Sequence, residues 1–212
     1  MKTSTWGAER AEISSSGPIP ADSSTVGPGN ARGYPRSVLS SSPVHLETLA
    51  NGLTVLLREV HVAPVAEVQI WAAVGSADEG PGEEGLAHFH EHMLFKGTER
   101  RGVGEITAAV EGVGGRINAY TSFDVTCYHA TLPSAEVSVG LEVLADSVQH
   151  SVFDSEEIDR EIEVVLEEIR SAEDDPHHVL SDAMFSTAYQ VHPYRAPILG
   201  TRENVADLTH DK

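Results

Sequence analysis

The sequence has very little cysteine and few basic residues. Its only cysteine, Cys127, has no partner for a disulfide within the chain, which suits a reducing compartment. The 14 lysine and arginine residues stand against 33 aspartate and glutamate residues, for a formal net charge of −19. Because such a surface would repel a phosphate backbone, we exclude nucleic acid as a partner.

The sequence also lacks long apolar runs. No stretch of about eighteen apolar residues occurs, so no membrane span is predicted. The first residues lack the apolar core of a secretory signal, and the cytoplasm is therefore the expected location. Hydrophobic residues make up 40% and charged residues 22% of the 212 residues, which is typical of a globular protein with one full core.

Two regions of different composition divide the chain. Residues 1–43 are rich in serine, glycine and proline and show almost no apolar periodicity. Such a segment cannot bury enough apolar area to offset the entropy of ordering it, so a disordered tail is predicted there. Residues 44–212 are predicted to form a folded domain. We expect this domain to be incomplete at its C-terminal end, because the last residues resemble the start of a helix.

The folded region is predicted to combine strands and helices in short blocks. Asn51-Gly52 is a two-residue hairpin signal that joins a strand beginning near Val44 to a strand over 53–60. Further strands are predicted over 65–74 and within 116–132, and helices over 86–96, 103–113, 135–150, 155–172 and 176–189. This order predicts the α+β class, with a mixed, mostly antiparallel sheet and helices packed on one face.

A run of histidines and one glutamate on the helix predicted over 86–96 indicates a metal site. Successive residues of an α-helix are about 100° apart, so His88 and His92 lie within about 40° of each other on one face. Two neutral imidazoles at that spacing can bind one Zn²⁺. Glu91 lies about 60° to the side, where it can contact a water on the metal, and His90 points away. The pattern H-x-x-E-H is typical of inverzincin metallopeptidases.

A catalytic zinc needs a third protein ligand, and the helix predicted over 155–172 offers several glutamates. Glu161 and Glu168 fall within about 20° of each other at one margin of its apolar stripe. From the margin of a buried face, either carboxylate can reach an internal metal. Spacing alone does not choose between them.

Other residues have plainer interpretations. The adjacent pair His177 and His178 diverges by about 100° on a helix, so we interpret it as exposed rather than metal-binding. Cys127 lies in a strand pattern and is interpreted as a small core residue rather than a nucleophile. Phe89 is interpreted mainly as a packing residue, with a place in the lining of the substrate pocket as a second role.

The sequence resembles the M16 metallopeptidase family, which includes pitrilysin, insulinase and mitochondrial processing peptidase. The matching motifs are HFHEHMLFKGT over 88–98, RINAYT over 116–121 and VVLEEI over 164–169, and the resemblance extends over about residues 46–208. It implies a zinc site with His88 and His92 as ligands and Glu168 as the third ligand. It also implies an accessory glutamate, Glu161, that supports the site.

The same resemblance implies a zinc-dependent endopeptidase that hydrolyses extended polypeptides by a metal-activated water, with Glu91 as the general base. The substrate would bind as an added strand at Asn118 and Ala119. Members of the family carry two homologous domains that form a clamshell, so a second domain or subunit is expected to complete the enzyme. The alternative is a non-catalytic or partner-dependent zinc-binding subunit.

Overall fold

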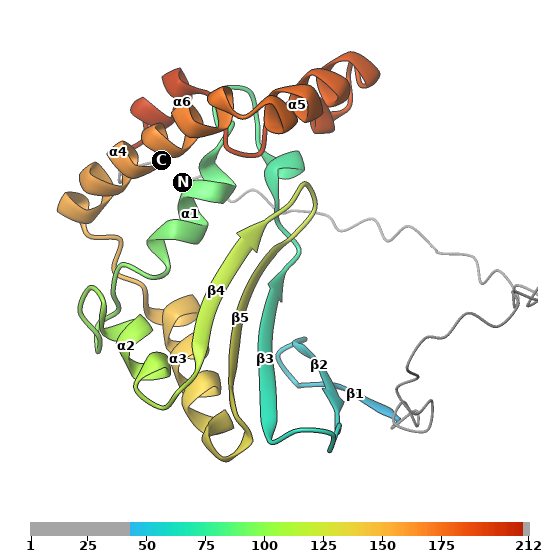
Figure 1. Cartoon of the computed structure of the whole chain (residues 1–212), viewed down its shortest axis with the longest axis vertical. Coiled ribbons are helices and arrows are strands. Elements are labelled where there is room, and N and C mark those ends of the chain that lie inside the picture. Colours follow the sequence, from blue (N-terminus) through green and yellow to red (C-terminus); the bar gives the residue numbers. More distant parts are fainter. Residues whose placement is uncertain (1–42, 210–212) are drawn as a thin grey trace, which may run out of the picture. The chain divides into compact units, whose positions relative to one another are not determined.

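The computed structural model describes residues 43–209, and all of its helices and strands lie in the unit that begins at Val44 (Figure 1). The predicted disordered tail therefore lies outside the described residues, except for Pro43. The strands are β1 (Val44–Thr48), β2 (Thr54–Arg58), β3 (Val65–Ala72), β4 (Arg116–Thr121) and β5 (Thr126–Pro133). The α-helices are α1 (Leu86–Met93), α2 (Glu105–Glu111), α3 (Val137–His150), α4 (Ser155–Asp174), α5 (Pro176–Ala188) and α6 (Arg202–Ala206). Short 3₁₀ helices are η2 (Ser76–Asp78), η3 (Ser134–Glu136) and η4 (Pro193–Arg195). Within the described residues, no helix has both the length and the apolar character needed to cross a membrane.

The hairpin of β1 and β2 closes with a longer turn than predicted. Residues 50–52 form a loop between Leu49 and Leu53, whose backbones are still hydrogen-bonded (2.8 Å). The Gly52 N–H donates to the Leu49 C=O (2.9 Å), and Gly52 has a φ of +90°. The turn therefore closes with a bond between residues three apart, and its last residue is left-handed. The prediction of a two-residue turn was wrong, because Leu49 still pairs with Leu53 and the loop therefore has three residues. The side chain of Asn51 accepts the Leu53 N–H (3.1 Å) within this loop.

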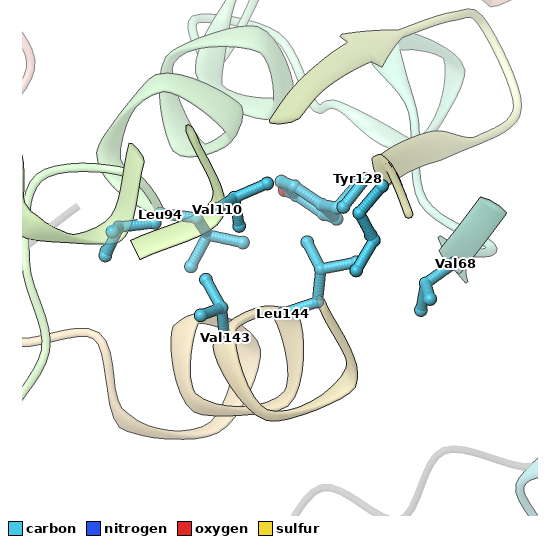
Figure 2. Close-up of a cluster of buried hydrophobic side chains, with 9 residues drawn as sticks. Val68, Leu94, Val110, Tyr128, Val143 and Leu144 are labelled. Atoms are coloured by element: carbon cyan, nitrogen blue, oxygen red, sulfur yellow. The ribbon is translucent and has the colours of Figure 1, made fainter. Parts of the chain in front are cut away.

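The other three strands form an antiparallel sheet in the order β3-β5-β4. Alternate residues of these strands point to opposite faces, and one face is covered by α2, α3 and the end of α1. The cluster of buried side chains between them is shown in Figure 2, and its members are Val68, Leu94, Ile106, Val110, Tyr128, Ala130, Leu132, Val143 and Leu144. The predicted α+β class with helices on one face is confirmed, and every strand pairing in residues 43–209 is antiparallel.

A second apolar cluster joins α4 to α1, which lie side by side in Figure 1. Asp154 caps the start of α4 by accepting the N–H groups of Glu156 (2.9 Å) and Glu157 (3.3 Å). The buried members of the cluster are Phe89, Met93, Ile158, Val165, Ile169, Val205 and Leu208. Because this packing involves one stripe of α4, it fixes which glutamates of α4 face α1.

A buried carboxylate ties the segment after α1 to α3. Asp146 is 3% exposed and accepts hydrogen bonds from Thr98 Oγ1 (2.7 Å) and Arg101 Nη1 (2.5 Å). His150 Nδ1 lies 3.1 Å from its other oxygen. Burial opposes the ionisation of Asp146, but the bonds from Thr98 and Arg101 outweigh it and hold its pKa below the usual range. The segment that follows α1 is thereby fixed to the core.

Replacing Asp146 by asparagine should lower the free energy of unfolding by about 3 kcal/mol, since it removes the buried charge that Arg101 and Thr98 bind. Glu142→Gln removes an exposed partner of Arg101 and should cost less than about 0.5 kcal/mol. Urea unfolding at neutral pH measures both, and equal costs would contradict the prediction. A lowered carboxyl pKa stabilises the fold above the ordinary carboxyl pKa, so this contribution should be lost as the pH falls through the lowered value.

Candidate metal centre

Helix α1 places two imidazole rings one turn apart. The Nε2 atoms of His88 and His92 lie 3.3 Å from each other. His88 is 7% exposed, and the side chain of His92 is 21% exposed. The structure therefore brings together the two histidines that the helical spacing predicts on one face.

Glu168 of α4 completes a triangle with these rings. Its Oε2 lies 3.7 Å from His88 Nε2 and 3.6 Å from His92 Nε2. A tetrahedral ion with bonds of about 2.0–2.1 Å separates its ligand atoms by about 3.3–3.4 Å, so the triangle fits such an ion closely. The Glu168 side chain is 45% exposed, which leaves the site open to solvent on that side. These three are the only group of potential ligands of this kind in residues 43–209.

Glu161 lies two turns before Glu168 and contacts the outer side of His92. Its Oε1 is 2.8 Å from His92 Nδ1, and its Oε2 forms an ion pair with Lys96. A carboxylate on Nδ1 selects the tautomer that leaves Nε2 free to bind a metal. The structure thus separates the two glutamates that sequence spacing left equivalent, with Glu168 in the triangle and Glu161 behind His92.

Glu91 of α1 lies beside these three residues, and its side chain contacts Thr121, the last residue of β4. It is 8% exposed, and one of its oxygens accepts a hydrogen bond from Thr121 Oγ1 (2.6 Å). Burial raises the pKa of Glu91 above the usual range, and the charge of Glu168 adds to the shift, while the Thr121 bond and the charge of His92 oppose it. A carboxylate with a raised pKa is a better proton acceptor near neutral pH than an exposed one.

The surroundings shift the pKa values of the two imidazoles in opposite directions. Burial and the charge of His92 lower the pKa of His88 to about 4, so this ring is neutral, which is the form that binds metals. Burial also opposes the protonation of His92, but the bond to Glu161 and the nearby carboxylates outweigh it and raise its pKa. The carboxylates around His92 therefore favour a positive charge at this place, which a divalent cation would supply.

The remaining predicted residues lie outside the triangle. His90 packs beside Phe153, with ring centroids 5.2 Å apart. Phe89 is 5% exposed within the cluster between α1 and α4, which favours its packing role over contact with a substrate. Asn118 and Ala119 lie on β4, an edge strand of the sheet. One edge of β4 pairs with β5, and no other strand of residues 43–209 pairs with its second edge.

Sequence reasoning missed two residues of the site, Thr121 and Lys96. Lys96 follows His92 by one helical turn, and this spacing was a signal that could have placed it near the same carboxylate. Thr121 ends the RINAYT motif, but nothing in that motif predicts its bond to Glu91, because the contact depends on how β4 lies against α1.

The family model described as Insulinase (Peptidase family M16) matches residues 54–202. The chain belongs to the M16 peptidase family. This confirms the family prediction made from the sequence motifs.

Individual relatives of this M16 chain agree with that assignment. A probable mitochondrial-processing peptidase subunit beta of Arabidopsis thaliana is 39% identical over 174 residues, covering 82% of this chain and 33% of that protein. An uncharacterized zinc protease of Rickettsia bellii is 37% identical over 167 residues, covering 79% of this chain and 40% of that protein. The crystal structure of a protease from Helicobacter pylori matches with a TM-score of 0.77 and 33% identity, covering 80% of this chain and 41% of that one. This M16 chain thus spans about two fifths or less of the length of these relatives.

The geometry predicts an order of effects on metal affinity. Glu168→Gln should weaken zinc binding the most, because it removes one corner of the triangle. Glu161→Gln should weaken it by about 10- to 100-fold, the usual cost of losing a partner of a ligating histidine. Glu163→Gln, an exposed position on the same helix, should leave the affinity unchanged.

Competition with a chromophoric chelator measures all three affinities under identical conditions. A larger loss in Glu161→Gln than in Glu168→Gln would reverse the two assignments. A loss in Glu163→Gln would show that the net charge of α4, rather than direct ligation, governs binding.

Proposed function

We propose that this M16 chain is the zinc-binding part of an endopeptidase, with His88, His92 and Glu168 as the ligands. The observation that carries the proposal is the triangle of 3.3, 3.6 and 3.7 Å formed by their ligand atoms. Two imidazoles and one carboxylate, with an open fourth position, form a typical ligand set of catalytic zinc. When bound, zinc lowers the pKa of a water molecule and polarises the carbonyl of the substrate.

Glu91 is the proposed general base. Its position beside the triangle and its raised pKa suit a group that accepts a proton from the attacking water and passes it to the leaving amine. Thr121 holds one oxygen of Glu91 and leaves the other available for this transfer. Glu161, with Lys96 on its second oxygen, keeps His92 in the ligand tautomer.

The free edge of β4 is the proposed binding place for the substrate backbone. The Ala119 N–H donates to the side-chain oxygen of its neighbour Asn118 (2.9 Å), a local bond that an incoming strand can replace. An extended peptide added at this edge runs toward Thr121, which bonds to Glu91. The substrates proposed are therefore polypeptides in extended form, and an acidic chain surface favours cationic ones.

Glu91→Gln should keep zinc bound and lower the rate of peptide hydrolysis by about 10²- to 10⁴-fold, the usual contribution of a general base. Zinc content by atomic absorption and cleavage of a quenched fluorescent peptide measure the two properties on the same sample. Thr121→Val serves as a companion variant and should cause a smaller loss, since it only orients Glu91. Turnover at the wild-type rate in Glu91→Gln would eliminate the mechanism.

The second candidate function is a zinc-binding part that cleaves peptides only with a second M16 domain or subunit. It is favoured by the fact that the chain spans 33% of the Arabidopsis relative and 41% of the Helicobacter protease. The same peptide assay, run with the purified chain alone and with the second M16 domain of a relative, separates the two candidates. Hydrolysis by the chain alone that is abolished in Glu91→Gln would rule out the second candidate.

A further inference from the structure

Helix α1, which carries two of the three proposed ligands, begins without a side-chain cap of its own. Its N-cap residue is Gly85, with a φ of +99° and no capping side chain. The first N–H groups of a helix have no acceptor inside the helix. The Leu86 N–H donates to the backbone C=O of Glu83 (2.9 Å), but the N–H groups of Gly85 and Ala87 need another acceptor.

The usual capping residues do not fit at Gly85. A Cβ at this position would lie 2.8 Å from the Leu199 carbonyl oxygen and 2.9 Å from the Cα of Gly200. The positive φ adds strain for any residue with a side chain. Serine, threonine or aspartate, which cap most helices, are therefore excluded here, and the cap has to come from elsewhere.

A single carboxylate from another segment supplies both missing acceptors. Glu79 Oε1 accepts the Ala87 N–H (2.7 Å), and Glu79 Oε2 accepts the Gly85 N–H (3.1 Å). A negative charge at a helix N-terminus also interacts favourably with the helix dipole. Glu79 thus acts as a two-point cap of α1 from a position six residues before its N-cap residue.

The segment that carries Glu79 is itself fixed to the β4–β5 hairpin. In η2, the Ser76 N–H donates to the Ser122 C=O (3.1 Å), and the Ala77 N–H donates to the Phe123 C=O (2.8 Å). The same hairpin supplies Thr121, which bonds to Glu91. Glu79 therefore connects the first turn of α1 to the hairpin that also orients the proposed general base.

The two histidines depend differently on this cap. His92 is held by its own partner, because Glu161 bonds to its Nδ1 (2.8 Å). The Nδ1 of His88 is buried and has no hydrogen-bond partner among residues 43–209. The orientation of His88 therefore relies on its packing and on the backbone next to it, and Ala87, the residue before it, is bonded to Glu79.

We propose that Glu79 is a positioning residue of the metal centre, which fixes the first turn of α1 and thereby the imidazole of His88 relative to His92 and Glu168. This inference rests on the proposed zinc site and adds a residue to its support. Glu79, which lies outside the H-x-x-E-H pattern of residues 88–92, would then determine the orientation of His88.

The surroundings of Glu79 oppose its ionisation, apart from the two N–H groups that it caps. Burial raises its pKa to about 7, the bonds from Ala87 and Gly85 oppose the shift, and the charges of Glu84 and Glu83 add to it. An acid whose pKa is raised by folding reduces stability as the pH rises from its ordinary pKa to the raised one. Ionisation of Glu79 therefore reduces the stability of the fold, so zinc affinity rather than stability is the readout that tests its role.

The test compares Glu79→Ala and Glu79→Gln with Glu83→Gln in the full chain. Glu83 lies in the same loop, and its carboxylate accepts the Gly80 N–H (2.9 Å) instead of a helix N–H. Glu83 bonds to Leu86 through its backbone C=O, so Glu83→Gln matches the charge change and removes no acceptor of α1. Zinc affinity is measured by chelator competition at pH 8. Hydrogen exchange of the Gly85 and Ala87 amides is measured in the metal-free protein.

Glu79→Ala should weaken zinc binding by about 10-fold or more, the usual effect of losing a group that supports a ligand. Glu79→Gln should show an intermediate loss, because its amide oxygen replaces one of the two acceptors. Both variants should exchange the Gly85 and Ala87 amides faster, with no change in the amides of α4. Glu83→Gln should match the wild type in both measurements.

Wild-type zinc affinity in Glu79→Ala would overturn the proposal even if the amides exchange faster, since Glu79 would then be only a structural cap. An equal loss in Glu83→Gln would also overturn it, because loop charge alone would explain the effect. If Glu79→Ala does not fold, the zinc affinity of Glu79→Gln decides the test, and a wild-type value would overturn the proposal. Failure of the wild-type chain to bind zinc would overturn the proposed metal centre itself, a result distinct from a variant that binds as the wild type does.

Discussion

The packing of α4 against α1 is the interaction on which the proposed metal centre depends. Neither helix can form the site alone, because the imidazoles come from α1 and the carboxylates from α4. The apolar cluster between them includes Val165, which is fully buried, and Ile169 at 5% exposed. Glu161 and Glu168 lie at the same margin of this stripe, so the energy that buries the apolar face also directs two carboxylates to His92.

The charges of the site are balanced by specific contacts. An isolated charge is costly to bury unless it is paired or hydrogen-bonded. Glu161, at 4% exposed, is bonded to both His92 and Lys96, and Glu91 is bonded to Thr121. Glu168 is the more exposed carboxylate, and its only ion pairs within residues 43–209 are with the two imidazoles, so it is the acid that a cation would neutralise. The arrangement assigns separate tasks to three glutamates through their surroundings rather than their residue type.

Much of this site was predictable from local sequence. Helical spacing placed His88 and His92 on one face and reduced the third ligand to Glu161 or Glu168, because the period of an α-helix is fixed. Spacing could not choose between these two, since the choice depends on the point at which α4 crosses α1. The contacts of Thr121 and Glu79 with α1 also depend on tertiary structure, so local sequence patterns do not predict them.

The fold was predictable to a similar degree. The fold class and the order of the elements followed from periodicity. The turn after β1 did not, because the structure has a longer loop there, in which the side chain of Asn51 accepts a backbone N–H. The helix predicted over 86–96 ends at Met93, where the chain turns toward Thr98 and its bond to Asp146. Such ends are decided by tertiary contacts rather than by helix propensity.

The most direct test of the central claim is the position of the metal in a crystal of the zinc-loaded chain, located by anomalous scattering at the zinc edge. The account predicts one strong peak per chain, about 2.0–2.2 Å from His88 Nε2, His92 Nε2 and one oxygen of Glu168. A zinc peak away from these side chains, or one bound by the two histidines without any carboxylate of α4, would contradict it.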